Sequence, residues 1–227
     1  MYPRAGPKKL RSLRMTRRAR LVSLALFLGA SIVGAAGGDR PSPPSVPTYT
    51  EDGKLVFPAN YREWIYLTSG IDMSYFPNGV AGHSIFDNVF VNPEAYRAFT
   101  QTGTWPDKTM LVLETRVAAT DASINKSGHF QTIELMGREV HVKDQGRFPG
   151  NWAFFGFDDK DTAKMVPHEA ACYSCHEKHA AVDTTFVQFY PTLIEIAKGK
   201  ATLSPGYLTD EKAFSSSQKT AKPSSNR

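Results

Sequence analysis

The chain has two cysteines, and they lie three residues apart with a histidine directly after the second, in the sequence Cys172-Tyr173-Ser174-Cys175-His176. This C-x-x-C-H pattern is typical of covalent haem attachment. Two thiols one helical turn apart can bond to both vinyl groups of a porphyrin, and the following histidine can offer its Nε2 to the iron as the proximal ligand. The pattern therefore predicts one haem c, held by Cys172, Cys175 and His176.

Two other interpretations of the same residues stay open. A thioredoxin-like dithiol also uses C-x-x-C, although it does not need the adjacent histidine. A zinc site would need two further ligands, and His179 is the nearest candidate. Export of the chain would favour haem, because c-type haem is attached outside the cytoplasm.

The N-terminus resembles a secretory signal. Residues 1–20 carry eight basic residues and no acidic one, residues 21–33 are uncharged and apolar, and Gly34, Ala35 and Ala36 supply the small residues of a cleavage site. The apolar run is shorter than the roughly 20 residues of a membrane span, so an uncleaved anchor is the alternative. We predict a signal peptide over residues 1–36, with Met1 or Met15 as the start, and a periplasmic mature protein.

The net charge depends on that signal. The whole chain carries +5, from 27 basic and 22 acidic residues. Removal of residues 1–36 leaves 19 basic and 22 acidic residues, a net charge of −3. The mature protein therefore offers no electrostatic case for nucleic-acid binding.

Composition divides the rest of the chain into three parts. Residues 37–51 are rich in Pro and Ser and are expected to be a linker. Residues 52–203 are long enough for one hydrophobic core and form the predicted haem domain. Residues 204–227 are polar and Ser-rich, and we expect a disordered tail.

Hydrophobic patterning predicts an α+β fold, in which an antiparallel β-sheet packs over the haem with a few short helices. Strands are expected over residues 83–91, 110–117, 129–135, 138–143 and 151–157, with Met136-Gly137 as a hairpin turn. A helix is expected over residues 94–102, since Pro93 suits its first turn and Gly103 its end. Shorter helices are expected near residues 60–64, at the haem motif and over residues 192–198.

Several stretches, taken in order, resemble the cytochrome P-460 and cytochrome c′-beta family. They are residues 60–64 (NYREW), 91–96 (VNPEAY), 102–103 with Asp107, 142–148 (VKDQGRF), 150–154 (GNWAF) and 172–191 (CYSCHEKHAAVDTTFVQFYP). The resemblance spans residues 60–193 and implies a periplasmic mono-haem homodimer, with an antiparallel sheet over a haem that is usually five-coordinate.

The resemblance also assigns positions on the distal side of the haem. Leu113 stands where the hydroxylamine-oxidising members have a lysine bonded to the porphyrin, and leucine cannot form that bond. Asp87 stands at the place of a distal arginine, and Glu139 matches a distal carboxylate. Hydroxylamine oxidation is therefore disfavoured.

Strand periodicity supports a role for Glu139. Alternation places Glu139, His141 and Lys143 on one face of their strand. If that face covers the haem, burial should raise the pKa of Glu139, which could then relay protons as a general acid or base. If it is an outer face, Glu139 and Lys143 lie in water. Leu113 could be an apolar cap that favours small neutral ligands, or ordinary core.

A sixth iron ligand would change the function. Candidates are His83, His129, His141, His168, His179, Met73, Met110, Met136 and Met165, with His141 and Met110 first. Two classes of function follow. One is a protein that binds nitric oxide or a similar ligand, or exchanges electrons with a redox partner. The other is an oxidoreductase acting on hydroxylamine or peroxide through Glu139.

Overall fold

The computed structural model describes residues 45–74, 84–158 and 160–221. Its main feature is a five-stranded antiparallel sheet whose strands lie side by side in chain order. The strands are β2 (Ile65–Ile71), β3 (Ile85–Val91), β4 (Met110–Ala119), β5 (Phe130–Lys143) and β6 (Trp152–Gly156). A two-stranded sheet pairs β1 (Leu55–Val56) with β7 (Thr162–Ala163). The α+β class and the antiparallel sheet are thus confirmed.

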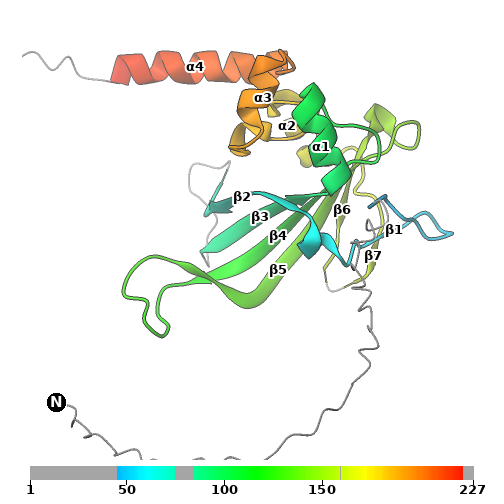
Figure 1. The fold of residues 1–227 in the computed structure, drawn as a ribbon, viewed down its shortest axis with the longest axis horizontal. Coiled ribbons are helices and arrows are strands. Elements are labelled where there is room, and N and C mark those ends of the chain that lie inside the picture. Colours follow the sequence, from blue (N-terminus) through cyan, green and yellow to red (C-terminus); the bar gives the residue numbers. More distant parts are fainter. Residues whose placement is uncertain (1–44, 75–83, 159, 222–227) are drawn as a thin grey trace, which may run out of the picture. The chain divides into compact units, whose positions relative to one another are not determined.

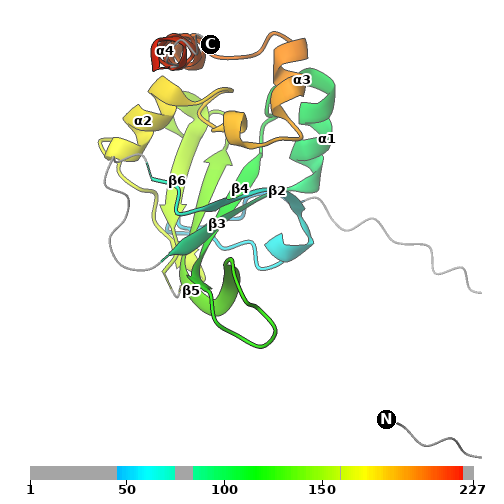
Figure 2. The same cartoon turned by 90° about the vertical axis from the view of Figure 1, so that its left-hand side faces the viewer.

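Short helices complete the described fold. The α-helices are α1 (Pro93–Thr102), α2 (Ala171–His179), α3 (Ile194–Gly199) and α4 (Pro205–Ala221), and the 3₁₀ turns are η1 (Tyr61–Glu63), η2 (Pro149–Asn151) and η3 (Val187–Phe189). Figures 1 and 2 show α2, α3 and α4 gathered on one side of the large sheet.

Both faces of the large sheet are covered by apolar side chains. Because successive strand residues point to opposite faces, Leu111 joins a core with α1, η3 and α3, whereas Val112 joins a second core with β1 and η1. The second core also contains Met110. The pocket described below lies on the helix side of the sheet.

Helix α1 begins and ends where its sequence predicts. Pro93 occupies its first turn, and Gly103 ends it in the left-handed conformation at φ 75°. The N–H of Gly103 donates to the carbonyl of Phe99 at 2.7 Å, and a Cβ on Gly103 would lie 2.7 Å from the Cβ of Lys200. Glycine is needed here both for its positive φ and for this close approach.

The predicted hairpin turn at Met136-Gly137 is wrong. Strand β5 runs unbroken through both residues, and Gly137 pairs with Thr115 of β4. The register shifts between Thr115 and Arg116, and this bulge bends the pair of strands without ending β5. The chain instead reverses in the segment between Ala119 and Phe130.

The expected disordered tail contains a helix over most of its length. The hydroxyl of Ser204 accepts from the N–H of Tyr207 at 3.1 Å and so caps α4, with Pro205 as its first residue. Tyr207 is buried in the helix-side core, and Asp210 lies 2.6 Å from His179 of α2. Ser204-Pro205 is a helix-start signal, but it opens a polar, Ser-rich stretch whose composition predicts disorder.

The expected linker also packs against the domain in its described part. Tyr49 pairs with Leu55, and its hydroxyl donates to Asp144 at 3.0 Å. The expected signal peptide, residues 1–36, lies outside the described residues. Within the described ranges, every helix is too short or too polar to cross a bilayer.

Candidate functional site

Helix α2 carries the haem motif. Cys172 and Cys175 both have free, partly exposed thiols, and His176 is partly buried. Residues three apart lie one above the other on a helix surface, so both thiols point to one side of α2. The geometry that the sequence predicts for a haem attachment helix is present.

His176 is held by a turn that follows α2. Its Nδ1 lies 2.7 Å from the carbonyl oxygen of Thr184, and a carbonyl can only accept, so Nδ1 carries the proton. Nε2 is therefore the nitrogen with a lone pair. Burial lowers the pKa of His176, although the hydrogen bond to Thr184 acts in the opposite direction. The ring is thus kept neutral, as an iron ligand must be.

A pocket lies between the helix-side face of the sheet and the segment around His176. Its free space, including the open mouth, is about 1020 Å³. The sheet contributes one residue pair from each of four neighbouring strands together with Phe154, and the other wall contributes His176 and aromatic side chains. The lining is Thr68, Gly70, Met73, Asp87, Val89, Leu111, Leu113, Glu139, His141, Phe154, His176, Thr185, Phe186, Phe189 and Tyr190.

Three residues that were predicted for the distal side line this pocket together. Leu113 of β4 pairs directly with Glu139 of β5, and Asp87 of β3 pairs with Thr115. The structure therefore brings Leu113, Glu139 and Asp87 into the same cavity as His176. They come from three neighbouring strands, which sequence order alone does not place side by side.

Glu139 is accessible from the pocket, yet its surroundings disfavour ionisation. Burial by neighbouring protein atoms raises its pKa, and the charge of Asp87 raises it further. The pKa of Asp87 is also raised by burial, although a hydrogen bond from Thr115 at 2.9 Å acts in the opposite direction. Two carboxyls that both resist ionisation can hold and release a proton inside the pocket.

Met110 and His141, the first two candidates for a sixth iron ligand, lie where they are poorly placed to bind the iron opposite His176. Met110 points to the opposite face of the sheet, in the core with Val112. His141 does line the pocket, but its ring centroid is only 5.4 Å from that of His176, and its Nε2 lies 3.2 Å from the Thr184 hydroxyl. Met73 is the other candidate among the lining residues, and His83 lies outside the described residues.

Sequence reasoning missed several lining residues and the acceptor of His176. Thr184 and Thr185 follow α2 in an irregular segment with no periodic pattern. Proximity to the haem motif was the one available signal, because a segment that returns past a helix often packs against it. Thr68 and Gly70 belong to β2, a strand that the sequence did not reveal.

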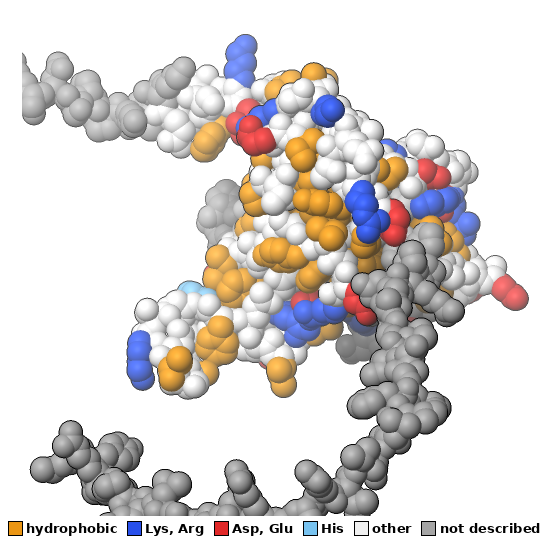
Figure 3. Space-filling model, in the orientation of Figure 1, with side chains coloured by type: hydrophobic (Ala, Val, Ile, Leu, Met, Phe, Trp, Pro, Cys, Tyr) orange, Lys and Arg blue, Asp and Glu red, His pale blue; other side chains and the backbone are white. Residues whose placement is uncertain are grey.

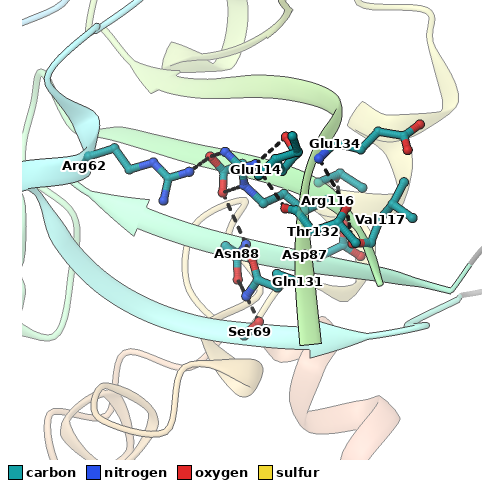
Figure 4. A network of polar contacts seen from close by, with 12 residues as sticks. Arg62, Ser69, Asp87, Asn88, Glu114, Arg116, Val117, Gln131, Thr132 and Glu134 are labelled. Atoms are coloured by element: carbon teal, nitrogen blue, oxygen red, sulfur yellow. Dashed lines mark hydrogen bonds and ion pairs between the residues drawn. The ribbon is translucent and has the colours of Figure 1, made fainter. Parts of the chain in front are cut away.

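Glu114 is a buried carboxylate that the sequence did not single out. It lies on the face opposite the pocket and contacts Arg62 and Arg116 (Figure 4). It also accepts a hydrogen bond from the hydroxyl of Tyr61. Burial opposes its ionisation, but the hydrogen bonds from Arg116 and Tyr61 and the charge of Arg62 outweigh burial and lower the pKa. Glu114 is therefore an ionised structural group that ties η1 to the sheet.

The described residues contain no group of three or more His, Cys, Asp or Glu side chains arranged to hold a metal ion. The zinc interpretation therefore lacks its ligands in the described part of the chain. A haem needs a different set, namely two thiols, one neutral imidazole and a large apolar cavity. Cys172, Cys175, His176 and the pocket supply that set, so the site fits a haem.

Comparison with known proteins agrees with this geometry. Residues 58–187 match the family described as Cytochrome P460, a range that covers more than half of the chain and includes the haem motif and all but the last two lining residues. A comparison with curated proteins found no significant match. Membership in this family implies a haem cofactor. The chain belongs to the cytochrome P460 family.

Proposed function

We propose that this protein is a periplasmic mono-haem c-type cytochrome that binds a small ligand such as nitric oxide. Cys172 and Cys175 would hold the haem through thioether bonds, and His176 would bind the iron through Nε2. When bound, haem iron supplies a coordination site for diatomic or nitrogenous molecules. One observation carries the proposal. His176 lines the pocket, and its Nδ1 donates to the carbonyl of Thr184, so its Nε2 is the nitrogen left to bind iron.

The composition of the pocket favours small neutral ligands. Leu111, Leu113, Val89 and Phe154 give it an apolar wall, which does not solvate ions. Any ionised fraction of Glu139 and Asp87 repels anions. Leu113 also lacks the amine needed for a porphyrin cross-link, which argues against the hydroxylamine-oxidising role.

A second candidate is an oxidoreductase acting on hydroxylamine or peroxide. The raised pKa of Glu139, which lines the pocket, favours it. A carboxyl with a pKa moved toward neutrality is suited to general acid or base catalysis. In this case Glu139 would donate or accept the proton that accompanies the chemistry.

A third outcome is an electron carrier, and Met73 is the observation that favours it. Its thioether lines the pocket, and methionine opposite histidine is a common axial pair in cytochromes c. A redox partner protein would then be required. The coordination number of the iron separates this outcome from ligand binding.

The deciding experiment is the optical spectrum of the mature holoprotein in both redox states, together with a pyridine haemochrome. A high-spin haem c spectrum that changes on addition of nitric oxide supports the proposal. A sharp low-spin spectrum indicates a sixth protein ligand and electron transfer. A strongly red-shifted ferrous Soret band indicates a porphyrin cross-link and favours the hydroxylamine-oxidising function instead.

Export and dimer formation belong to the same proposal. The n-region, apolar run and small residues of positions 1–36 support export to the periplasm.

Ile124 and Ile133 are 90% and 97% exposed on the projecting β4–β5 hairpin, where Figure 3 shows hydrophobic side chains at the surface. An apolar surface of this kind supports a homodimer.

A further inference from the structure

The acceptor of the His176 proton lies in a tight turn with an unusual backbone. Thr185 donates its N–H to the carbonyl of Val182 at 2.9 Å, and the two residues form an isolated bridge. Between them, Asp183 adopts a positive φ of 51°, which is uncommon for a residue with a side chain. A turn of this kind keeps its shape only when surrounding contacts hold it.

Strand β5 supplies two of those contacts. Nε2 of His141 lies 3.2 Å from the hydroxyl of Thr184. Nζ of Lys143 donates to a carboxylate oxygen of Asp183 at 2.9 Å and to the carbonyl of Trp105 at 2.8 Å. His141 and Lys143, on one face of β5, thus contact Thr184 and Asp183, the two central residues of the turn.

A third contact comes from Trp105, in the segment that precedes β4. The indole N–H of Trp105 donates to the hydroxyl of Thr185 at 2.7 Å, and that hydroxyl donates to the carbonyl of Val182 at 2.8 Å. Each residue from Asp183 to Thr185 therefore has its own side-chain tie to a distant part of the chain.

His141 is itself rigidly placed. It is 8% exposed, and its ring stacks on that of Phe154 with the centroids 3.9 Å apart and the planes 13° apart. Its backbone pairs with Leu111 on one side and Phe154 on the other, so β5 is an interior strand at this point. A group built on an interior strand holds its position more closely than one on a loop.

We propose that His141 and Lys143 are positioning residues for the proximal ligand: they clamp the turn at Asp183 and Thr184 so that the Thr184 carbonyl fixes His176 for iron binding. This inference rests on the proposed function, because it takes His176 to be the ligand. The held hydrogen bond fixes the tautomer and orientation of His176 and makes its Nε2 more basic. A more basic ligand stabilises ferric iron relative to ferrous iron, so the clamp lowers the reduction potential.

The test uses the holoprotein and four variants. His141→Phe keeps an aromatic ring on Phe154 but removes Nε2, and Thr184→Val keeps the size of the side chain but removes the hydroxyl. Thr184→Ser retains the hydroxyl. Thr202→Val is the matched control, because the Thr202 hydroxyl donates to the carbonyl of Gly103 at 2.7 Å, away from the pocket. The readouts are the midpoint potential and the ferrous iron–histidine stretching frequency.

His141→Phe and Thr184→Val should each shift the ferric–ferrous equilibrium toward ferrous by about tenfold, a scale taken from the lower end of the losses in metal affinity seen when a partner of a metal ligand is removed. For one electron this is a rise of about 59 mV. The stretching frequency should fall in both. Thr184→Ser and Thr202→Val should match the wild type, and the double variant His141→Phe/Thr184→Val should resemble either single variant, because one hydrogen bond is lost in all three.

An unchanged potential and stretching frequency in both His141→Phe and Thr184→Val would overturn the proposal, as would equal shifts in Thr184→Ser and Thr184→Val. If either variant fails to incorporate haem, Lys143→Met provides the decisive measurement. This variant removes the contact between Lys143 and Asp183, which does not involve Thr184, the residue that holds His176. For the proposal to stand, it must raise the midpoint potential and lower the stretching frequency, as His141→Phe and Thr184→Val do. Absence of covalent haem from the wild type would refute the proposed function itself.

Discussion

Leu113 and Glu139 lie opposite each other on neighbouring strands, and together they set the chemistry of the pocket. The leucine offers no proton, charge or nucleophile, and it gives the pocket wall an apolar surface. The pKa of the carboxyl beside it is raised by the protein atoms that surround it and, to a smaller extent, by the charge of Asp87. An apolar wall and a proton-holding carboxyl together suit a neutral ligand whose binding is sensitive to pH.

The two cysteines give the most direct residue-level prediction. Cys172→Ala and Cys175→Ala should each abolish the normal two-bond haem attachment, because one thioether is lost in each, and the double variant should carry no covalent haem. Ser174→Ala is the control, since Ser174 is exposed on the same helix. Haem staining after denaturing electrophoresis checks this, and haem retained by the double variant would remove the haem c assignment.

Glu139 yields a pH prediction whose sign follows from its raised pKa. A carboxyl with a folded-state pKa above its unfolded value favours folding while it is protonated, and this contribution disappears as pH rises through the folded-state pKa. Glu139→Gln, which cannot ionise, should therefore be more stable than the wild type above that pKa and lose the corresponding inflection in ligand affinity. Denaturation and ligand titration across pH measure both effects.

The control for that experiment is Glu134→Gln, which changes an exposed glutamate on the same strand. It should leave the ligand titration as in the wild type. A Glu139→Gln variant with an unaltered pH profile would show that the carboxyl does not communicate with the bound ligand.

At the scale of elements, Glu114 joins parts of the fold that are far apart in the chain. It accepts from Tyr61 at 2.5 Å, from Arg116 at 2.8 Å and from Asn88 at 3.4 Å, and it also pairs with Arg62. These partners lie in η1, β3 and β4, and Gln131 extends the network to β5 through Asn88. One carboxylate thus ties the 3₁₀ turn and three strands together.

Removing that charge should be costly. Glu114→Gln should lower the free energy of unfolding by about 1 to 3 kcal/mol, because the partly buried Arg116 loses its charged partner while water screens the half-exposed Arg62. The wild-type contribution is present above the unfolded pKa of a glutamate and is lost as pH falls through the lowered folded-state pKa. Chemical denaturation at several pH values measures this, with the exposed Glu63→Gln as control.

A loss in Glu114→Gln no larger than that in Glu63→Gln would mean that the network contributes nothing net to stability. Haem incorporation should stay normal in both variants, since Glu114 faces away from the pocket. The prediction therefore separates the stabilising face of the sheet from the face that carries the site.

At the scale of the whole molecule, the exposed apolar hairpin predicts a homodimer that charge should disrupt. Ile133→Glu places a carboxylate on a position that is 97% exposed in the single chain, so the monomer should fold normally while a dimer burying this position should dissociate. Sedimentation velocity at several concentrations measures the change. Glu51→Lys, a charge change on an exposed position outside the hairpin, is the control, and a dimer that persists in Ile133→Glu would exclude this surface from the interface.

Much of the site could be predicted because it depends on local spacing. The separation of Cys172 from Cys175 places two thiols on one side of a helix wherever that helix lies. Alternation likewise places Leu113 and Glu139 on definite faces of their strands, and Pro93 and Gly103 bound α1 through their own backbone preferences. In each case the geometry follows from residues within a few positions of one another.

The remaining features depend on which faces meet, and spacing does not encode that. Both faces of the large sheet are covered by apolar cores, so the sequence could not show that Met110 points away from the pocket while His141 lies beside His176. The sequence by itself determined the helix that carries the C-x-x-C-H motif and the residues that share each strand face. Tertiary structure alone decided that β5 meets the turn at Thr184 and that Arg62 contacts the buried Glu114, because those contacts join residues 43 and 52 positions apart.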